Sequence, residues 1–235
     1  MTNPTAAIII IGNEILSGRT LDLNTQEIAL RLDETGISLL ETRTIPDNKN
    51  MIIDAIRHLS AAYDYVFTTG GIGPTHDDIT AESVAAAFNV KCVVNQDAYN
   101  RLKDYSIKVG EPLNPAREKM AYMPESATLL YPGFVIKNVF VMAGIPEVTK
   151  TMLKAAIPML KKGKIVKTKT LEVMTSESRI ASQFENLQNK YKGVEMGSYP
   201  FTKDGIHGTA LVLRSADYEA LEAAFKDLKE IVSPA

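Results

Sequence analysis

The chain has 235 residues, with 26 basic and 28 acidic side chains and a hydrophobic content of 45%. This length and composition are those of a globular protein with one large domain and a smaller companion. The near-neutral charge balance gives no electrostatic reason to expect a nucleic-acid or anionic-membrane partner. Cys92 is the only cysteine, which excludes an intrachain disulfide and suits the reducing cytosol.

The first apolar segment bears on both location and fold. The run 6–11 is too short for the hydrophobic region of a signal peptide and for a membrane span, so we expect a cytoplasmic protein with no membrane partner. A continuous apolar run of this length is typical of a strand that is covered on both faces. It therefore predicts a parallel sheet.

Apolar strands and amphipathic helices alternate over the next hundred residues, which predicts a βαβαβ order. A helix is expected to begin at Asn24, where Glu27 gives a capping-box pattern. Asp47 or Asn48 is expected to cap the next helix. The expected elements are, in order, a strand at 6–11, a helix at 24–36, a strand at 37–45, a helix around 52–59, a strand at 65–68, and helices at 80–88 and 97–109.

The rest of the chain divides into the end of this domain and a second one. Residues 110–137 contain four prolines and are expected to form turns. A strand at 138–143, a loop at 144–146 and a helix at 148–160 complete a first domain, which we place at residues 1–162. Residues 163–235 read as strand 165–174, helix 177–191, strands 194–199 and 208–214, and helix 218–232.

This second domain is a small βαββα unit. At about 70 residues it would be marginally stable alone, so packing or dimerisation is expected and the protein is predicted to be a homodimer. Lysines cluster at its start, which leaves nucleic-acid binding as an alternative reading. We favour packing or dimerisation, because the unit lacks a Gly-x-x-Gly clamp and has few aromatic platforms.

The most informative segment is the loop 68–78, directly after the third strand. Gly70, Gly71 and Gly73 let the backbone turn sharply, so that successive N–H groups can point at phosphate oxygens. The N-terminal dipole of the following helix adds to the attraction for an anion. The loop matches neither a dinucleotide-binding fingerprint nor a P-loop. It is therefore predicted to bind the phosphate group of a small molecule by its backbone, and Thr75 in the same loop to contact that ligand.

Asp77 and Asp78 place two carboxylates beside the predicted phosphate site. They would repel the ligand unless one of them caps the next helix or a divalent cation such as Mg²⁺ bridges the charges. One reading makes one aspartate a helix cap and leaves the other in solvent. In the other reading, Asp78 reaches the phosphate as a metal ligand or general base while Asp77 holds the loop.

More polar residues follow the other strands, and the carboxyl ends of parallel strands meet at one edge of a sheet. After the first strand, Glu14 could bind a metal or a ribose hydroxyl, and Ser17 could donate to a phosphate. Asn24 could hydrogen-bond the ligand. Asp47 follows the second strand and is a third acid on this edge. A capping or loop role fits each of these residues equally well.

Several segments at this edge also match a known family pattern. They are Gly12–Gly18, Asp22 with Asn24, Ile45–Asp47, Thr69–Thr80 and Ala143–Glu147. On these segments the chain resembles the molybdenum-cofactor-biosynthesis, or molybdopterin-binding, superfamily. It is most similar to the N-terminal part of CinA-like competence-damage-inducible proteins and to the matching domain of eukaryotic FAD synthases. The resemblance covers roughly residues 5–160 and extends more weakly over the C-terminal unit.

The resemblance implies a three-layer α/β/α domain with a mostly parallel sheet that binds a pterin phosphate or an adenine dinucleotide. For the CinA-like branch it implies metal-dependent hydrolysis of a pyrophosphate bond in ADP-ribose-like or FAD-like substrates. The positions that match Asp47 and Asp78 are acids tied to catalysis in molybdopterin adenylyltransferases.

Two features depart from the family pattern. Asn13 stands where the family usually has aspartate, and the loop before Pro132 is shorter than in CinA-like proteins. They favour a first alternative, a non-catalytic molybdopterin or nucleotide binding protein. The second alternative is a molybdopterin adenylyltransferase.

The sequence thus gives a defined set of expected site residues. Asp78 and Asp47 are predicted to be catalytic, and Asp78 with Glu14 to hold a divalent metal, Mg²⁺. Substrate contacts are predicted for Gly12, Glu14, Ser17, Asn24, Gly70, Gly71, Gly73, Thr75 and Asp77.

Overall fold

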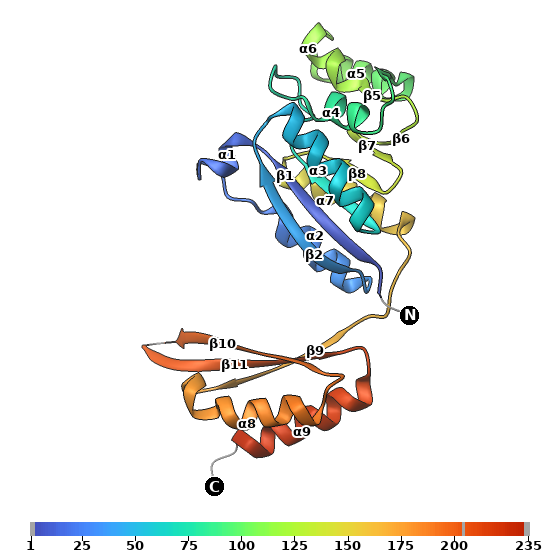
Figure 1. Ribbon diagram of the computed structural model, residues 1–235. Helices are drawn as coiled ribbons and strands as arrows, with labels where there is room; N and C mark the ends of the chain where they lie inside the picture. Colours follow the sequence, from blue (N-terminus) through green and yellow to red (C-terminus); the bar gives the residue numbers. More distant parts are fainter. Residues whose placement is uncertain (1–2, 204, 233–235) are drawn as a thin grey trace. The chain divides into compact units, whose positions relative to one another are not determined.

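The computed structural model describes residues 3–203 and 205–232 (Figure 1). These residues divide between Gly163 and Lys164 into two compact units, one residue after the boundary expected at 162. Each unit has its own hydrophobic core. Across the described ranges, no helix combines the length and the apolar composition that a bilayer span requires.

A six-stranded sheet forms the centre of the first unit. Its strand order is β2-β1-β3-β8-β7-β6. The first four strands are parallel, β7 pairs antiparallel with β8, and β6 pairs antiparallel with β7. The strands are β1 Thr5–Ile11, β2 Ser38–Ile45, β3 Tyr65–Thr69, β6 Thr128–Leu130, β7 Gly133–Ile136 and β8 Val139–Met142.

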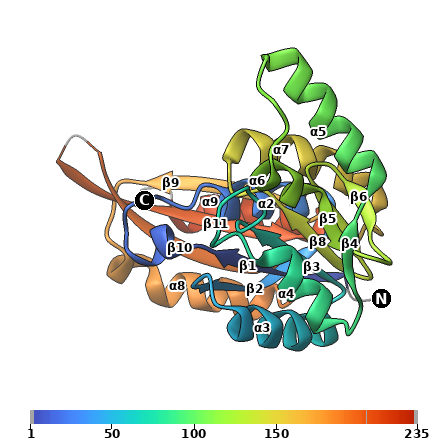
Figure 2. The ribbon, with the colours of Figure 1, turned by 90° about the horizontal axis from the view of Figure 1, so that it is seen from above.

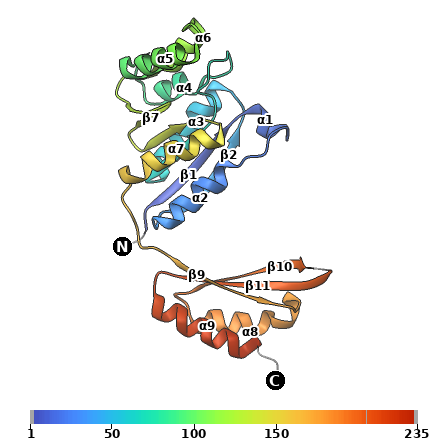
Figure 3. The same cartoon turned by 180° about the vertical axis from the view of Figure 1, so that it is seen from behind.

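Helices cover both faces of this sheet (Figures 1 and 3). Ile8 and Ile10 of β1 pack with α2 and α7 on one face, and Ile9 and Ile11 pack with α3 and α4 on the other. Because successive side chains of a strand alternate between faces, the isoleucine run of β1 fills both cores. The helices are α2 Asn24–Glu34, α3 Lys49–Ala62, α4 Thr80–Ala87 and α7 Pro146–Ala156. The predicted three-layer, mostly parallel α/β fold is confirmed.

The segment expected to form turns contains regular structure instead. Strands of three or four residues between prolines are too short to show a hydrophobic period, so the sequence pattern did not predict them. The expected helix at 148–160 also differs, because it begins at Pro146 and gives way to a 3₁₀ turn at Ile157. The elements not yet given for this unit are α1 Asn13–Leu16, β4 Cys92–Val94, α5 Gln96–Val109, α6 Pro115–Glu118, η1 Lys119–Ala121, β5 Tyr122–Pro124 and η2 Ile157–Met159.

Side-chain hydrogen bonds explain where two of the helices start. Asn48 Oδ1 accepts an N–H group of the first turn of α3 at 3.2 Å, so Asn48 rather than Asp47 is the cap. Asp22 Oδ1 accepts the N–H groups of the first two residues of α2 at 3.0 and 3.1 Å. The capping box expected for Asn24 and Glu27 is therefore wrong, because Asp22 caps this helix.

The second unit is a three-stranded antiparallel sheet with two helices packed on it, as the βαββα pattern predicts. Its strand order is β10-β11-β9, and the paired strands β10 and β11 extend past β9 (Figure 2). Leu211 and Leu213 of the central strand pack against Leu187 and Leu228 of the helices. The elements are β9 Lys167–Val173, α8 Glu177–Lys190, β10 Glu195–Lys203, β11 Ile206–Ser215 and α9 Tyr218–Val232.

Asn138 joins the β7–β8 turn to the end of α3. Its Nδ2 donates to the carbonyl oxygens of Ser60 and Tyr63, both at 2.9 Å. Because Asn138→Ala removes the donor of two half-buried carbonyls, we expect it to lower the free energy of unfolding by about 1–3 kcal/mol. Urea unfolding followed by circular dichroism measures the change. Asn50→Ala, at an exposed position of α3, is the control, and an equal loss in both variants would contradict the prediction.

Candidate functional site

The carboxyl ends of three neighbouring parallel strands meet at one edge of the large sheet. The chain leaves β1 for β2 on one side and returns to β3 on the other, so the strand order reverses between β2 and β3 around β1. Open α/β sheets bind ligands at such a position. A cleft of about 590 Å³ lies here, and its walls include the ends of β1, β3 and β8.

The glycine loop, residues 70–78, forms one wall of this cleft. Gly70 and Gly71 have φ angles of +100° and +67°. A Cβ atom at Gly70 would lie 2.1 Å from the carbonyl oxygen of Ile11, and one at Gly71 would lie 2.1 Å from Thr80 Oγ1. Glycine is therefore required at both positions, because the loop backbone passes directly against the end of β1 and the start of α4.

Three successive amides of the glycine loop are free to bind a ligand. Within residues 3–203 and 205–232, the N–H groups of Gly71, Ile72 and Gly73 donate to no protein atom. All three residues line the cleft. The amides on either side are used, since Gly70 donates to Met142 O at 3.2 Å and Thr75 donates to Asp78. Unpaired consecutive N–H groups form an anion-binding concavity.

Asp78 closes the glycine loop and also faces the cleft. Its Oδ2 accepts the N–H of Thr75 at 2.8 Å and the Thr75 hydroxyl at 2.7 Å. Its Oδ1 accepts no hydrogen bond from the described residues, so this oxygen is available to a cation or a water. Asp77 is exposed and lies outside the cleft wall. A hydrogen bond from the Thr75 hydroxyl holds the pKa of Asp77 below its usual value.

The turn after β1 places a second carboxylate in the cleft wall. Glu14, in the short helix α1, folds back over Gly12, where a Cβ atom would lie 2.5 Å from Glu14 Oε1. Glu14 lines the cleft, whereas Gly12 and Ser17 do not. The Ser17 hydroxyl donates to Glu14 O and accepts from Arg19 Nε, both at 3.2 Å. Ser17 therefore holds the turn.

Asp47 and Asn24 fix the backbone that frames the cleft. Asp47 Oδ2 accepts the N–H of Asn13 at 2.9 Å, and Asp47 lies outside the cleft wall. Asn24 is buried in the wall, and its Nδ2 donates to Gly144 O at 2.7 Å. Asp47 thus anchors the β1–α1 turn, and Asn24 ties the start of α2 to the β8–α7 loop.

The structure separates the predicted site residues into two groups. Those that line the cleft are Glu14, Asn24, Gly70, Gly71, Gly73 and Asp78. Those that lie outside its wall are Gly12, Ser17, Asp47, Thr75 and Asp77. Several members of the second group hold backbone or carboxylates of the first in place, so their predicted contacts with a substrate stay predictions.

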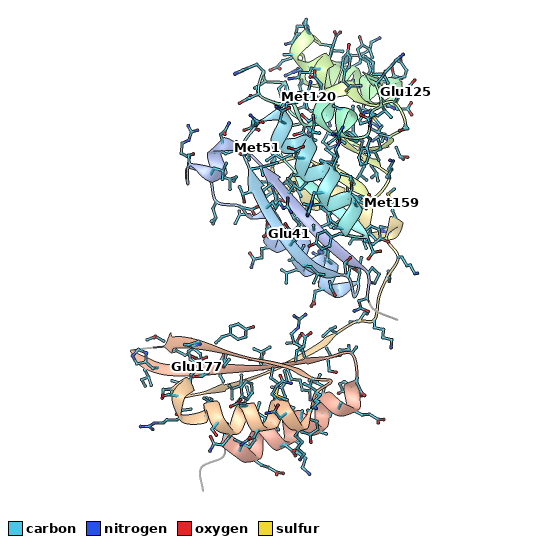
Figure 4. The ribbon with its side chains drawn as sticks, viewed as in Figure 1. Glu41, Met51, Met120, Glu125, Met159 and Glu177 are labelled. Atoms are coloured by element: carbon cyan, nitrogen blue, oxygen red, sulfur yellow. The ribbon has the colours of Figure 1, made fainter. Side chains whose placement is uncertain are left out.

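Sequence reasoning missed the contribution of the segment 119–132. Met120 and Pro132 line the cleft; Met120 is labelled in Figure 4, in the part of the first unit that carries α5 and α6. With the glycine loop, Met120 and Pro132 also line a second, apolar cavity of about 180 Å³, which Lys119 borders. The family pattern drew attention only to the loop before Pro132, and no period or motif marked Lys119 or Met120. Ile145 of the cleft could have been found, because it follows a parallel strand at the same edge.

The acids of the cleft fit a cation that is shared with a ligand. Asp78, Glu14 and Asp22 line the cleft. Both carboxylate oxygens of Asp22 accept hydrogen bonds from the first turn of α2, so Asp78 and Glu14 are the acids that remain for a cation. Among the residues that the structure describes, no group of three or more His, Cys, Asp or Glu side chains could hold a metal. Mg²⁺ is often bound by one or two carboxylates plus substrate phosphates. The donor set therefore suits Mg²⁺ bound together with a phosphate.

Comparison with known proteins identifies both units. A family model described as a probable molybdopterin binding domain matches residues 7–162, and one described as the middle domain of FAD synthase matches residues 165–235. A protein from Archaeoglobus fulgidus is 32% identical over 232 residues, which cover 96% of this chain and 97% of that protein. A probable FAD synthase from Caenorhabditis elegans is 30% identical, over 97% of this chain and 50% of its own length.

CinA-like proteins match over the same region. One from Geotalea uraniireducens is 33% identical over 81% of this chain and 49% of its own length, so the chain spans about half of some relatives. The crystal structure of a CinA protein from Thermoplasma acidophilum, described as having unknown function, superposes with a TM-score of 0.62 at 30% identity, covering 68% of this chain and 99% of that one. The chain therefore belongs to the molybdopterin-binding (MoCF biosynthesis) family, with CinA-like relatives, as the resemblance predicted.

Proposed function

We propose that the protein is a divalent-metal-dependent hydrolase of nucleotide pyrophosphate bonds that acts on ADP-ribose-like or FAD-like molecules. The observation behind the proposal is the row of three unbonded amides at Gly71–Gly73 beside the unbonded Oδ1 of Asp78. The amides provide an anion site, and the carboxylate provides a place for a cation or a water. Relatives named CinA-like protein and probable FAD synthase support a nucleotide as the ligand.

Each part of the cleft has a distinct task in this reaction. The glycine-loop amides bind the non-bridging oxygens of the diphosphate and orient its anhydride bond. The bonds from Thr75 keep Asp78 fixed beside the reacting phosphorus. Water adds to phosphorus, Asp78 accepts the proton, and the P–O bond of the anhydride breaks to give two phosphate monoesters. Mg²⁺, held by Glu14 and the substrate phosphates, would supply charge neutralisation at the phosphates, because the open oxygen of Asp78 accepts the proton.

A non-catalytic pterin or nucleotide carrier is the second candidate. It is favoured by the neutral Asn13 side chain in the turn after β1 and by the small number of metal-binding groups among the described residues. In such a carrier the same amides bind the anion, and Asp78 only closes the glycine loop. Molybdopterin adenylylation is separated from both by its product, an adenylylated pterin made only when ATP and pterin are present together.

The proposed hydrolase activity can be tested directly by the release of AMP. Purified protein incubated with FAD or ADP-ribose and Mg²⁺, Mn²⁺ or Co²⁺ is expected to release AMP, and EDTA is expected to stop the release, because the phosphate charge is then no longer neutralised. Chromatography of the nucleotides measures the product. Folded protein that releases no AMP with any of the three metals would overturn the hydrolase.

Asp78→Asn separates the enzyme from the carrier. The amide oxygen of asparagine can still accept the bonds from Thr75, but it cannot take a proton, so we expect kcat to fall by about 100-fold or more with little loss of affinity. Steady-state kinetics and calorimetric titration measure the two quantities. Asp104→Asn, on the exposed side of α5, is the matched control. An equal and small effect of both substitutions on kcat would contradict a role for Asp78.

Gly73→Ala tests the position of the same carboxylate. A Cβ atom at Gly73 would lie 2.7 Å from Asp78 Oδ2, so the carboxylate must move. Because a small displacement of a reacting group is costly, we expect kcat to fall by about 10- to 100-fold while the melting temperature changes little. Gly193→Ala, with no atom within 4 Å of the added Cβ, is the control. Unchanged kcat in Gly73→Ala would argue against the position assigned to Asp78.

A further inference from the structure

One cationic side chain, Lys119, lines the apolar cavity, which shares the glycine loop with the cleft. Among the described residues that line the cleft or the apolar cavity, the acids are Glu14, Asp22, Asp78 and Glu82, and Lys119 is the only lysine, arginine or histidine. A diphosphate bound at the loop amides would meet several negative charges and this single fixed positive one. The charge of Lys119 is therefore important for any anionic ligand.

The position of Lys119 is fixed by the glycine loop itself. Its Nζ donates to the carbonyl oxygen of Thr75 at 2.7 Å, across 44 positions of sequence. The side chain is half-buried and lines the apolar cavity together with Gly71 and Gly73. An ammonium group has three donors, and the bond to Thr75 uses one of them. The other two donors have no hydrogen-bond partner among the described residues.

The charge of Lys119 acts on the acids of the loop. After the hydrogen bond from Thr75, the positive charges of His76 and Lys119 also contribute to holding the pKa of Asp77 below its usual value. The bonded chain from Lys119 through Thr75 to Asp78 consists of direct contacts. Lys119 thus acts on Asp77 through its charge and is linked to Asp78 by hydrogen bonds through Thr75.

We propose that Lys119 Nζ contacts the phosphate groups of the ligand at the glycine loop, and that the carbonyl of Thr75 holds the ammonium in position for this contact. The inference rests on the proposed function, since it names the cation of the same site. The ligand class is a small molecule with a diphosphate. If Lys119 instead only ties η1 to the loop, its charge has no effect on ligand binding beyond its effect on the fold.

The test compares Lys119→Met with Lys119→Arg in the full chain. Calorimetric titration in EDTA, which prevents turnover, measures Kd for pyrophosphate, ADP-ribose and adenosine. We expect Lys119→Met to weaken pyrophosphate and ADP-ribose binding by about 10-fold or more and to make Kd less sensitive to salt, because a charge-assisted contact is lost. Lys119→Arg keeps the charge and should stay within about fivefold of the wild type. Adenosine binding should change less than about twofold.

The controls separate the two proposals. Lys103→Met, exposed on α5 and outside both cavities, should leave all three constants unchanged. The role of Lys119 is overturned if the wild type binds the diphosphates and Lys119→Met binds them equally well. It is also overturned if Lys119→Met weakens adenosine binding as much as diphosphate binding. In both cases the proposed anion site remains. If the wild type binds neither diphosphate in EDTA and also releases no AMP with Mg²⁺, Mn²⁺ or Co²⁺, both proposals fail. Lys119→Gln, a polar replacement, serves as the neutral variant if Lys119→Met melts below the wild type.

Discussion

The close approach of the Gly70 backbone to the carbonyl of Ile11 determines the shape of the site. Where the third strand ends, the chain turns so tightly against the first that no side chain fits between them. The next three residues line the cleft, and their amides donate to no atom of the described residues. Gly71, Ile72 and Gly73 are half-buried, so their three amides without a protein partner mark a place where water or a ligand can bind.

Two acids beside an anion site create an electrostatic conflict, and the loop limits it through hydrogen bonds. Thr75 is central, because its amide and hydroxyl bind carboxylate oxygens of Asp77 and Asp78 while its carbonyl accepts from Lys119. One oxygen of Asp78 is thereby used and the other is left open. Thr75, which lies outside the cleft wall, thus determines which oxygen of Asp78 stays open.

Much of this arrangement could be predicted from the sequence, and the exceptions have physical causes. The isoleucine run of β1 and the glycine string after β3 depend on local rules, so they indicated the parallel sheet and the tight turn of the glycine loop. The short strands β6 and β7 and the position of Lys119 depend on contacts between distant segments, which leave no local period. The choice between Asp47 and Asn48 as cap depended on side-chain direction, which residue type alone does not specify.

The polar residues after the strands also show why a family pattern includes more than ligand contacts. Asp47 holds the amide of Asn13, and Asn24 holds the carbonyl of Gly144, so each ties one strand-end turn to the segment beside it. Loss of either hydrogen bond would shift the cleft wall without removing a carboxylate or amide that faces the cleft. The residue types alone do not separate the two roles, whereas the hydrogen bonds of the structure show which oxygens and amides of the cleft remain unused.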